Sequence, residues 1–311
     1  MNLSRFVAPS TFALIAAAIV AQAAPVRPPI TSVSHLSVYS ADAAKTEYFY
    51  VHNLGAVKRD DPENAKGVRY YFNALQFIEV LPLPEAEAKS ANRMDHVAYN
   101  TPDVKAMKRY LAAHGVKAQD AIRKGADGSQ WFDVSDPEGN IVQFVQPPKA
   151  PQPVADSPLS NHIIHVGFIV HDRTLEDGFY LKLLGFRPYW YGGKEGEKPA
   201  WISAQVPDGT DWMEYMMVSG PQTRGIPAAM SQSTAGVLNH FSLGVANMEK
   251  TVTLLREGGR ISEKNDGPKI GADGKWQFNT YDPDGTRAEF MEFQAVVKPC
   301  CSPFTASDPE K

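Results

Sequence analysis

The chain has 311 residues, of which 43% are apolar and 21% are charged, and its formal net charge is −4. This length and composition are those of a globular protein with two domains, and they exclude a disordered chain. A pI near 6.1 comes with no basic patch along the sequence, so we do not expect a nucleic acid partner.

The first two dozen residues differ in character from the rest. Arg5 precedes the apolar run TFALIAAAIV (11–20), and Ala21-Gln22-Ala23 follows as a small-x-small cleavage site. This pattern predicts a secretory signal peptide over residues 1–23. The apolar run is short for a transmembrane helix. We therefore expect an exported protein, periplasmic or secreted, that leaves the membrane after cleavage.

Four strand-like segments, SHLSVYS, DHVAYN, IHVGFIV and NHFSLGV, each carry a histidine: His35, His96, His165 and His240. Each is followed 44 to 49 residues later by a strand-like stretch with Glu or Gln, at Glu79, Gln143, Glu214 and Glu289. Imidazole and carboxylate are ligands that zinc, nickel, iron and manganese accept. The repeat therefore predicts metal sites built between repeated units.

Each unit continues after its histidine strand with a helix and three strands. Residues 103–114 form the predicted helix of the second unit, with Thr101 as its N-cap, and Asn247 begins a helix of the fourth unit that Gly258 ends. EYFYVHNLGA (47–56) matches DGFYLKLLGF (177–186), and GADGSQWFDVSDPEGN (125–140) matches GADGKWQFNTYDPDGT (271–286). The sequence thus predicts a β-α-β-β-β unit four times over.

The Pro-rich segment 148–160 has no periodicity and reads as a linker. It separates a predicted N-terminal domain (31–147) from a C-terminal domain (161–296), which a tail (297–311) follows. The tail holds the only two cysteines, the adjacent Cys300 and Cys301, which provide no disulfide framework. An intermolecular bond and a soft-metal contact remain alternatives, and we expect two ordinary thiols.

This arrangement resembles the vicinal oxygen chelate superfamily, which includes glyoxalases, extradiol dioxygenases, and fosfomycin- and bleomycin-resistance proteins. The resemblance rests on the histidine strands, the FY-x-x-x-LG helix ends and the DPDG-x-x-x-E closing hairpin, and it spans residues 31–296. It implies an α+β fold in which four βαβββ modules pair into two open, curved mixed β-sheet half-barrels. Because the superfamily supports many reactions on one scaffold, it implies fold more strongly than function.

The resemblance also implies that metal ligands come from the first and last strands of each module. In the C-terminal half these are His165, Glu214, His240 and Glu289, which would hold one divalent metal (Zn, Ni, Mn or Fe(II)), with Glu214 and Glu289 as catalytic carboxylates. The N-terminal half offers a weaker second set, His35, Glu79, His96 and Gln143, in which Gln replaces the expected acid. The alternative is that the histidines are structural strand residues.

Four of the five tryptophans lie in the second half, so we expect an aromatic pocket there for a small-molecule substrate. Its predicted lining residues are Trp201, Trp212, Trp276 and Tyr281. Three functions fit this pattern. The first is a glyoxalase-like lyase or isomerase, favoured because Glu214 supplies a fourth ligand. The second is an extradiol-type dioxygenase using Fe(II), and the third is a binding or resistance protein without turnover. The fold would also permit exchange of modules between chains in a homodimer.

Overall fold

The computed structural model of the chain describes residues 25–309 except 194–197, 220–221, 224–225 and 228. The signal peptide expected over residues 1–23 lies outside the described residues. Among the described helices, none is both long and apolar enough to cross a membrane.

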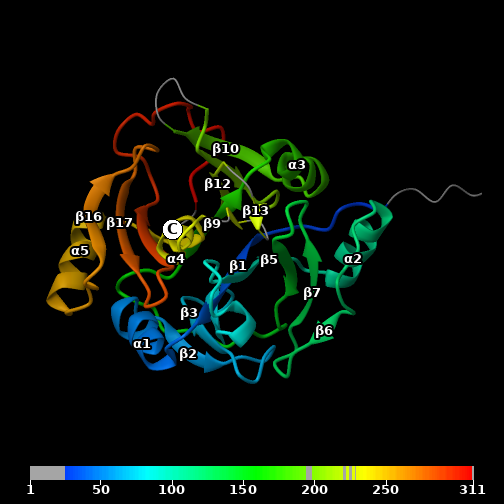
Figure 1. Cartoon of the computed structure of the whole chain (residues 1–311), viewed down its shortest axis with the longest axis horizontal. Helices are drawn as coiled ribbons and strands as arrows, with labels where there is room; N and C mark the ends of the chain where they lie inside the picture. The colour runs from blue at the N-terminus through cyan, green and yellow to red at the C-terminus, as the bar shows by residue number, and fades with distance from the viewer. Residues whose placement is uncertain (1–24, 194–197, 220–221, 224–225, 228, 310–311) are drawn as a thin grey trace, which may run out of the picture.

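Two eight-stranded sheets form the body of the protein (Figure 1). The first has the strand order β2-β3-β4-β1-β5-β8-β7-β6, and the second has the equivalent order β10-β11-β12-β9-β15-β18-β17-β16. The elements of the N-terminal half are β1 (Ser32–Ser40), α1 (Ala43–Glu47), η1 (Tyr48–Asn53), β2 (Val57–Asp60), β3 (Val68–Tyr71), β4 (Phe77–Pro82), η2 (Glu85–Glu87), β5 (Met94–Asn100), α2 (Val104–Ala113), β6 (Arg123–Lys124), β7 (Gln130–Ser135) and β8 (Ile141–Gln146). Those of the C-terminal half are β9 (Ile163–Val170), α3 (Arg173–Asp177), η3 (Gly178–Leu183), β10 (Arg187–Gly192), β11 (Trp201–Gln205), β12 (Trp212–Met217), β13 (Gln222–Thr223), β14 (Ile226–Pro227), α4 (Gln232–Leu238), β15 (His240–Val245), α5 (Met248–Glu257), β16 (Asn265–Ile270), β17 (Trp276–Tyr281) and β18 (Arg287–Glu292).

Each sheet consists of two four-stranded modules joined by their first strands. Within a module the first and last strands are parallel, as in β1 with β4 and β9 with β12. Between modules the two first strands are antiparallel, β1 with β5 and β9 with β15. The predicted α+β fold with repeated modules is therefore confirmed. The four histidines all lie on these first strands, at the centre of each sheet.

The module helices begin and end close to the predicted positions. Asn247 caps α5, as predicted, because its side chain accepts a hydrogen bond from the backbone N–H of Lys250. The predicted Thr101 cap of α2 is wrong: Asp103 takes that role, its carboxylate accepting from the Ala106 N–H. A carboxylate two residues further along reaches the free amides of the first turn, and it also suits the positive end of the helix dipole.

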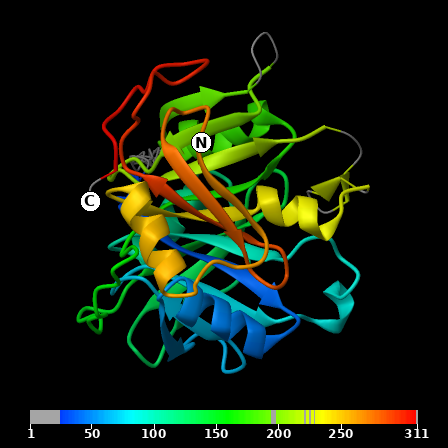
Figure 2. The ribbon, with the colours of Figure 1, turned by 90° about the vertical axis from the view of Figure 1, so that its left-hand side faces the viewer.

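A common core lies between the two halves, and the repeated motifs meet across it. The FY helix end of the first module places the Tyr50 hydroxyl 3.2 Å from Asp282, in the DPDG turn of the fourth module. Tyr180 of the third module donates in the same way, at 3.2 Å, to Asp136 in the DPEG turn of the second. Figure 2 shows the yellow to red strands of the C-terminal half lying above the blue and cyan strands of the N-terminal half. The two repeated signatures therefore hold the halves together.

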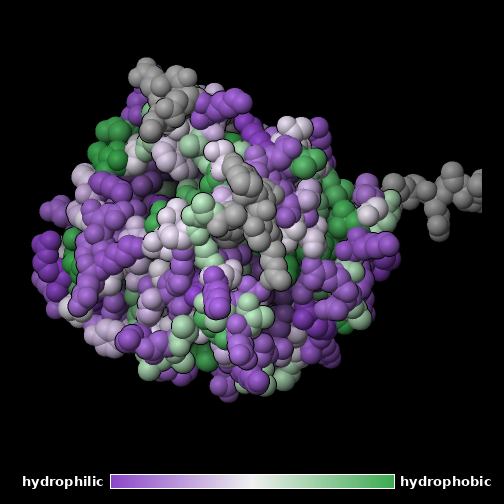
Figure 3. Space-filling model, in the orientation of Figure 1, coloured by the Kyte–Doolittle hydropathy of each residue, from purple (hydrophilic) through white to green (hydrophobic). Residues whose placement is uncertain are grey.

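Residues 148–160 contain no regular element, and Arg59 of β2 donates to the carbonyls of Gln152 and Pro153. The segment thus runs along the N-terminal half. On the face of the molecule that Figure 3 shows, hydrophobic residues occur in small groups separated by hydrophilic ones.

Candidate active site

Four predicted ligands of the C-terminal half come together at the centre of the second sheet. His165 lies on β9, Glu214 on β12, His240 on β15 and Glu289 on β18. The first and last strands of each module are neighbours, so residues of matching parity face the same side of the sheet. The register pairs Glu214 with Gly167 on β9, and His240 also lies opposite Gly167. Strand pairing thus brings residues 124 positions apart in sequence to one point.

The distances between these side chains fit a single metal ion. The Nε2 atoms of His165 and His240 are 3.1 Å apart. His165 Nε2 lies 3.4 Å from a Glu289 oxygen, and His240 Nε2 lies 3.7 Å from a Glu214 oxygen. Two nitrogens that bind one Zn²⁺ at about 2.1 Å lie about 3.0 to 3.4 Å apart for angles between octahedral and tetrahedral. His165, Glu214 and His240 form a group whose ligand atoms all lie within 4.8 Å of one another.

Gly167 makes room for the second imidazole. A Cβ at this position would lie 2.0 to 2.8 Å from ring atoms of His240, closer than any real contact. In the N-terminal sheet the corresponding residue is Ser37, which lies opposite His96. The glycine lets the His240 ring pack directly on the backbone of β9. The C-terminal site is therefore built to hold two histidines closely.

Both histidines are neutral, which is the form that binds metal. Burial is the largest cause that lowers the pKa of His165 and His240 well below the usual range, and the charge of Arg287 adds to it. The Nδ1 of His240 lies 2.7 Å from the Leu238 carbonyl. A carbonyl only accepts, so Nδ1 carries the proton and the Nε2 lone pair is directed at the site.

The carboxylates of Glu214 and Glu289 are buried, and the negative charge of one disfavours ionisation of the other. Burial, together with the charge of Glu289, raises the pKa of Glu214 to about 8. The pKa of Glu289 is raised to about 7, also chiefly by burial. Positive charge between these groups would favour their ionised forms, and a divalent cation supplies such charge. Two neutral imidazoles and two carboxylates carry a total charge of −2, so a site of these four groups and a divalent cation has no net charge. This donor set therefore fits a divalent metal.

A cavity of about 250 Å³ opens above these carboxylates. Glu214 and Glu289 form part of its wall, together with Trp201 and Trp212, as the sequence led us to expect. Trp276 is not among the wall residues. It packs instead against the main core, because it lies one residue out of step with Gln277 and Asn279, which do line the cavity.

Tyr281, also predicted for the pocket, is outside the cavity wall. It is 7% exposed, and its hydroxyl lies 3.4 Å from Asp266. The Lys264 ammonium group lies over its ring, 4.0 Å from the centroid. These contacts hold the Tyr281 side chain beside the site rather than in it.

The C-terminal tail completes the cavity wall, which the sequence did not reveal. Phe304 lines the cavity and packs on Tyr189, with ring centroids 4.9 Å apart. Asp308 accepts from Lys275 at 2.9 Å and from the Tyr189 hydroxyl at 2.7 Å. Lys275 is fully buried, so this ion pair anchors the tail at the cavity.

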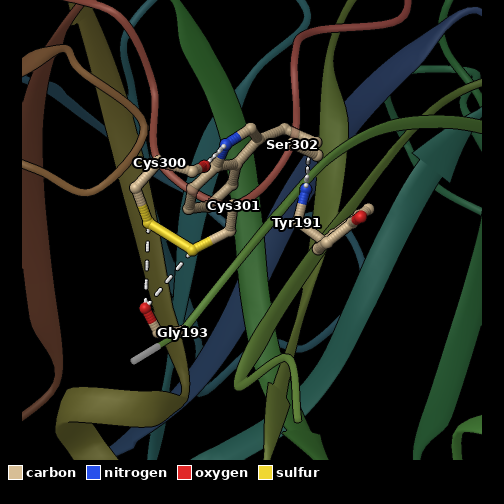
Figure 4. The surroundings of a disulfide bond; sticks show 6 residues. Tyr191, Gly193, Cys300, Cys301 and Ser302 are labelled. Atoms are coloured by element: carbon tan, nitrogen blue, oxygen red, sulfur yellow. Dashed lines mark hydrogen bonds between the residues drawn. A yellow bond between two sulfur atoms is a disulfide. The ribbon is translucent and has the colours of Figure 1, made fainter. Parts of the chain in front are cut away.

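The adjacent cysteines of the tail are joined in a disulfide, so the prediction of two free thiols is wrong (Figure 4). Cys301 has a φ of 72°, a left-handed conformation that lets the ring between neighbouring residues close. The Cys300 carbonyl accepts from the Trp190 indole at 3.2 Å, and Ser302 Oγ accepts from the Tyr191 amide at 3.0 Å. The disulfide turn therefore lies against β10, next to the cavity.

The N-terminal half forms a similar cluster without the fourth ligand. The Nε2 atoms of His35 and His96 are 2.8 Å apart, and a Glu79 oxygen lies 3.9 Å from His96 Nε2. These three residues form a second group that could hold a metal ion. Gln143 is not in this group: its amide nitrogen donates to Glu63 at 2.7 Å, and its Oε1 is buried without a hydrogen-bond partner.

A protein cation already lies beside this N-terminal cluster. Arg69 is 4% exposed and lies 2.9 Å from Asp61, 3.1 Å from Glu63 and 3.6 Å from Glu79. Burial would lower the pKa of His96, but the hydrogen bond to Asp95 and the charge of Glu79 raise it to about 9. Arg69 thus supplies a positive charge among these carboxylates, beside the group that could hold a metal.

Comparison with known proteins agrees with this architecture. The model of the Glyoxalase/Bleomycin resistance protein/Dioxygenase superfamily matches residues 32–144 and 162–290. These two segments cover most of the chain, one in each half, and the chain belongs to this superfamily. The comparison with curated proteins gives no match.

Solved structures of this superfamily share the fold. The 2,3-dioxygenase LapB from Pseudomonas sp. KL28 has a TM-score of 0.61 at 14% identity, over 89% of this chain and 97% of its own. Homoprotocatechuate 2,3-dioxygenase from Arthrobacter globiformis has a TM-score of 0.63 at 17% identity, over 86% and 80%. An Mn(II)-bound glyoxalase from Novosphingobium aromaticivorans has a TM-score of 0.61 at 17% identity, over 85% and 83%. At these identities the likeness concerns the fold alone.

Proposed function

We propose that this protein is a metal-dependent lyase or isomerase that acts in its C-terminal half on a small molecule with two neighbouring oxygens. The observation that carries this proposal is the position of Glu214. Its carboxylate lies 3.7 Å from His240 Nε2 and belongs to the group with His165 and His240 whose ligand atoms all lie within 4.8 Å of one another, while Glu289 adds a further carboxylate 3.4 Å from His165 Nε2. A fourth protein ligand suits proton transfer next to a chelated oxygen better than oxygen activation, which needs more open positions.

In this proposal different residues bind the metal and orient the substrate. His165 and His240 would bind the metal through Nε2, and Glu289 would complete the set beside His165. When bound, the metal supplies Lewis acidity that favours an oxyanion on the substrate. The surrounding tryptophans Trp201 and Trp212 exclude water from the site and orient the substrate above the carboxylates.

Glu214 would move the proton. Its Oε1 accepts from the Ser203 hydroxyl at 3.1 Å, which fixes the orientation of the carboxylate on the cavity wall. Because it lines the cavity and lies beside the two histidines, this carboxylate is placed to accept a proton from a bound substrate and to return it. A general base of this kind typically contributes about 10²- to 10⁴-fold to the rate.

An extradiol-type ring-cleavage reaction is the second candidate. His165, His240 and Glu289 would form the two-histidine, one-carboxylate face that Fe(II) oxygenases use, and the Glu289 oxygen lies 3.4 Å from His165 Nε2. Two of the similar structures described above are 2,3-dioxygenases. In this reading Glu214 would serve as a base and not as a ligand. A binding protein without turnover is the third reading.

The first experiment measures bound metal in the mature protein, residues 24–311, by elemental analysis. We expect about one equivalent in the wild type, loss of it in His240→Ala, and retention in the control His114→Ala, whose histidine is on an exposed surface. Retention of the full equivalent in His240→Ala would place the metal elsewhere. No metal in the wild type, even after reconstitution with each candidate ion, would overturn both enzyme readings.

The second experiment separates the reactions. Protein loaded with Zn, Ni or Mn is tested for wash-in of solvent deuterium into small α-hydroxy ketones, and Fe(II)-loaded protein is tested for oxygen uptake with catechols. We expect wash-in, and we expect Glu214→Gln to retain metal while the rate falls by about 100-fold or more. Oxygen uptake without wash-in would establish the dioxygenase reading instead.

We further propose that the protein is exported, on the basis of the signal-like residues 1–23. Mass spectrometry of the protein from a periplasmic or secreted fraction should give an N-terminus at Ala24. Size-exclusion chromatography with light scattering on the same sample tests the homodimer that module exchange would allow. A mass that still includes Met1, or material found only in the cytoplasm, would refute export.

A further inference from the structure

Arg287 is a cation of the cavity wall without a partner among the described residues. It begins β18, two residues before Glu289 on the same face, and it lies opposite His240 in the register. It lines the cavity, yet no carboxylate oxygen of the described residues lies within 4.0 Å of it. Its Nε is buried and has no hydrogen-bond partner. A partly buried guanidinium group without a hydrogen-bond partner lowers the stability of the folded protein unless a ligand pairs with it.

The other charged groups of the wall do have partners. Lys269 pairs with Asp266 at 2.9 Å. Asp273 accepts from the Lys275 amide at 3.1 Å and from the Gln277 side chain at 3.3 Å. The carboxylates Glu214 and Glu289 would be neutralised by the metal of the proposed function. The charge of Arg287 acts on both Glu214 and Glu289, but Arg287 is the cation of the described wall that forms no ion pair within 4.0 Å, so its donors are available to a ligand.

The fold does not require an arginine at this position. In the N-terminal sheet, His96 lies opposite Ile141, in the place where His240 lies opposite Arg287. Both strands make the same parallel pairing in the same sheet order. An apolar side chain at this position is therefore sufficient to form the sheet. The arginine has a role in the C-terminal cavity and not in the fold.

We propose that Arg287 selects a substrate that carries a carboxylate in addition to its two chelating oxygens. This inference rests on the proposed function and names its substrate class. Arginine presents a planar pair of donors that matches a carboxylate in a bidentate manner. The metal would hold one side of the substrate, and Arg287 would hold the carboxylate on the other.

The cavity and its walls suit a substrate that contains a ring. A cavity of about 150 Å³ holds benzene, so the 250 Å³ available here accommodates a single ring with small substituents. Trp190, Trp201 and Trp212 provide flat apolar walls, and Phe304 of the tail forms another side.

The test compares two probes that differ only in charge. Both 3,4-dihydroxybenzoate and 3,4-dihydroxybenzamide have one ring and two neighbouring oxygens. Their affinity is measured by tryptophan fluorescence quenching on the metal-loaded mature protein, without oxygen so that no turnover occurs. We expect the benzoate to bind about 10- to 100-fold more tightly, as for a hydrogen-bonded charge pair.

Variants assign this preference to the residue. In Arg287→Met, we expect the benzoate affinity to fall to that of the benzamide, with unchanged benzamide affinity and unchanged metal content. Arg287→Lys should recover part of the preference, because it keeps the charge but loses the bidentate geometry. Arg256→Met, which removes an exposed cation of α5, is the matched control and should behave like the wild type.

The outcomes separate the inference from the proposed function. If the benzamide binds and the benzoate binds no better, or if Arg287→Met weakens both probes equally, the carboxylate inference is wrong and the proposed function stands. If neither probe binds to protein that holds its metal, the proposed function fails and the inference fails with it. Tighter binding of 3,4-dihydroxyphenylphosphonate than of the benzoate would overturn the assignment to a carboxylate.

Discussion

Replacement of Arg69 by Met tests whether a protein cation has taken the place of a metal in the N-terminal half. Arg69 is 4% exposed, and its partners Asp61, Glu63 and Glu79 are 0, 9 and 1% exposed at their side chains. The substitution keeps most of the packing volume but removes the cation of Asp61, and it leaves Glu63 with Arg123 at 3.7 Å and Glu79 with His96 at 3.9 Å. We therefore expect a large loss in the free energy of unfolding.

The size of the effect follows from the burial of the cluster. Removal of one partner from a buried ion pair costs about 3 to 5 kcal/mol, which corresponds to a fall of about 5 to 8 °C in melting temperature for a chain of this length, at about 2.1 cal/mol/K of unfolding entropy per residue. Burial is the largest cause that raises the pKa of Asp61 to about 7, and likewise that of Glu63 to about 7. These groups are largely ionised at pH 8 and largely protonated at pH 6. The loss should therefore be greater at pH 8.

Thermal and urea unfolding, followed by circular dichroism at pH 6 and pH 8, measures this loss. The control is Arg173→Met, which breaks an exposed ion pair with Asp177 and should cost less than about 1 kcal/mol. A loss in Arg69→Met no greater than in this control would refute the reasoning. So would metal bound in the N-terminal half, seen as an equivalent that persists in the His240→Ala protein.

Three further substitutions test other features of the structure. Gly167→Ala should push the His240 ring out of place and weaken metal binding by more than about tenfold, measured by competition with a chelator; unchanged affinity would contradict the close packing. Burial, with neighbouring acidic charges, raises the pKa of Glu176 to about 9, so the folded protein holds a proton there that the unfolded chain has released at neutral pH. The contribution of this group to stability should therefore fall from about pH 4.5 to pH 9, by at most about 1.4 kcal/mol per pH unit, and Glu176→Gln should remove that part of the slope in thermal melts. Asp308→Ala leaves the buried Lys275 without its carboxylate and should cost about 1 to 3 kcal/mol in urea unfolding; a cost near zero would mean that the ion pair does not anchor the tail.

The sequence determined the repeated architecture, because its signals are local and occur four times. A histidine on a strand, a DP turn and a fixed spacing to a closing acid are each legible in a few residues. In strands, alternate side chains share a face, so ligands on the first and last strands of a module were expected to meet. That expectation led to His165, Glu214, His240 and Glu289; the structure brings the first three within 4.8 Å of one another and places Glu289 3.4 Å from His165 Nε2.

The tertiary structure alone decided what surrounds these ligands. Arg69 comes to the N-terminal cluster from a neighbouring strand, β3, and no local pattern distinguishes it from a surface arginine. The tail lies at the cavity because Asp308 pairs with the buried Lys275, which is 33 positions away in the sequence. Such contacts depend on register and on the path of the chain, which short-range periodicity does not specify.

The predictions for Trp276 and for the cysteine pair were wrong because both depend on backbone geometry that composition does not specify. Trp276 was assigned to the pocket by composition, whereas the alternation of β17 places it on the core face. The cysteine pair was expected to be free, whereas the left-handed backbone at Cys301 brings the two sulfurs together. Sequence thus determined which residues could act as ligands. Only the packed chain determined which charges remain unpaired beside them, and Arg287 is the one on which substrate choice is proposed to depend.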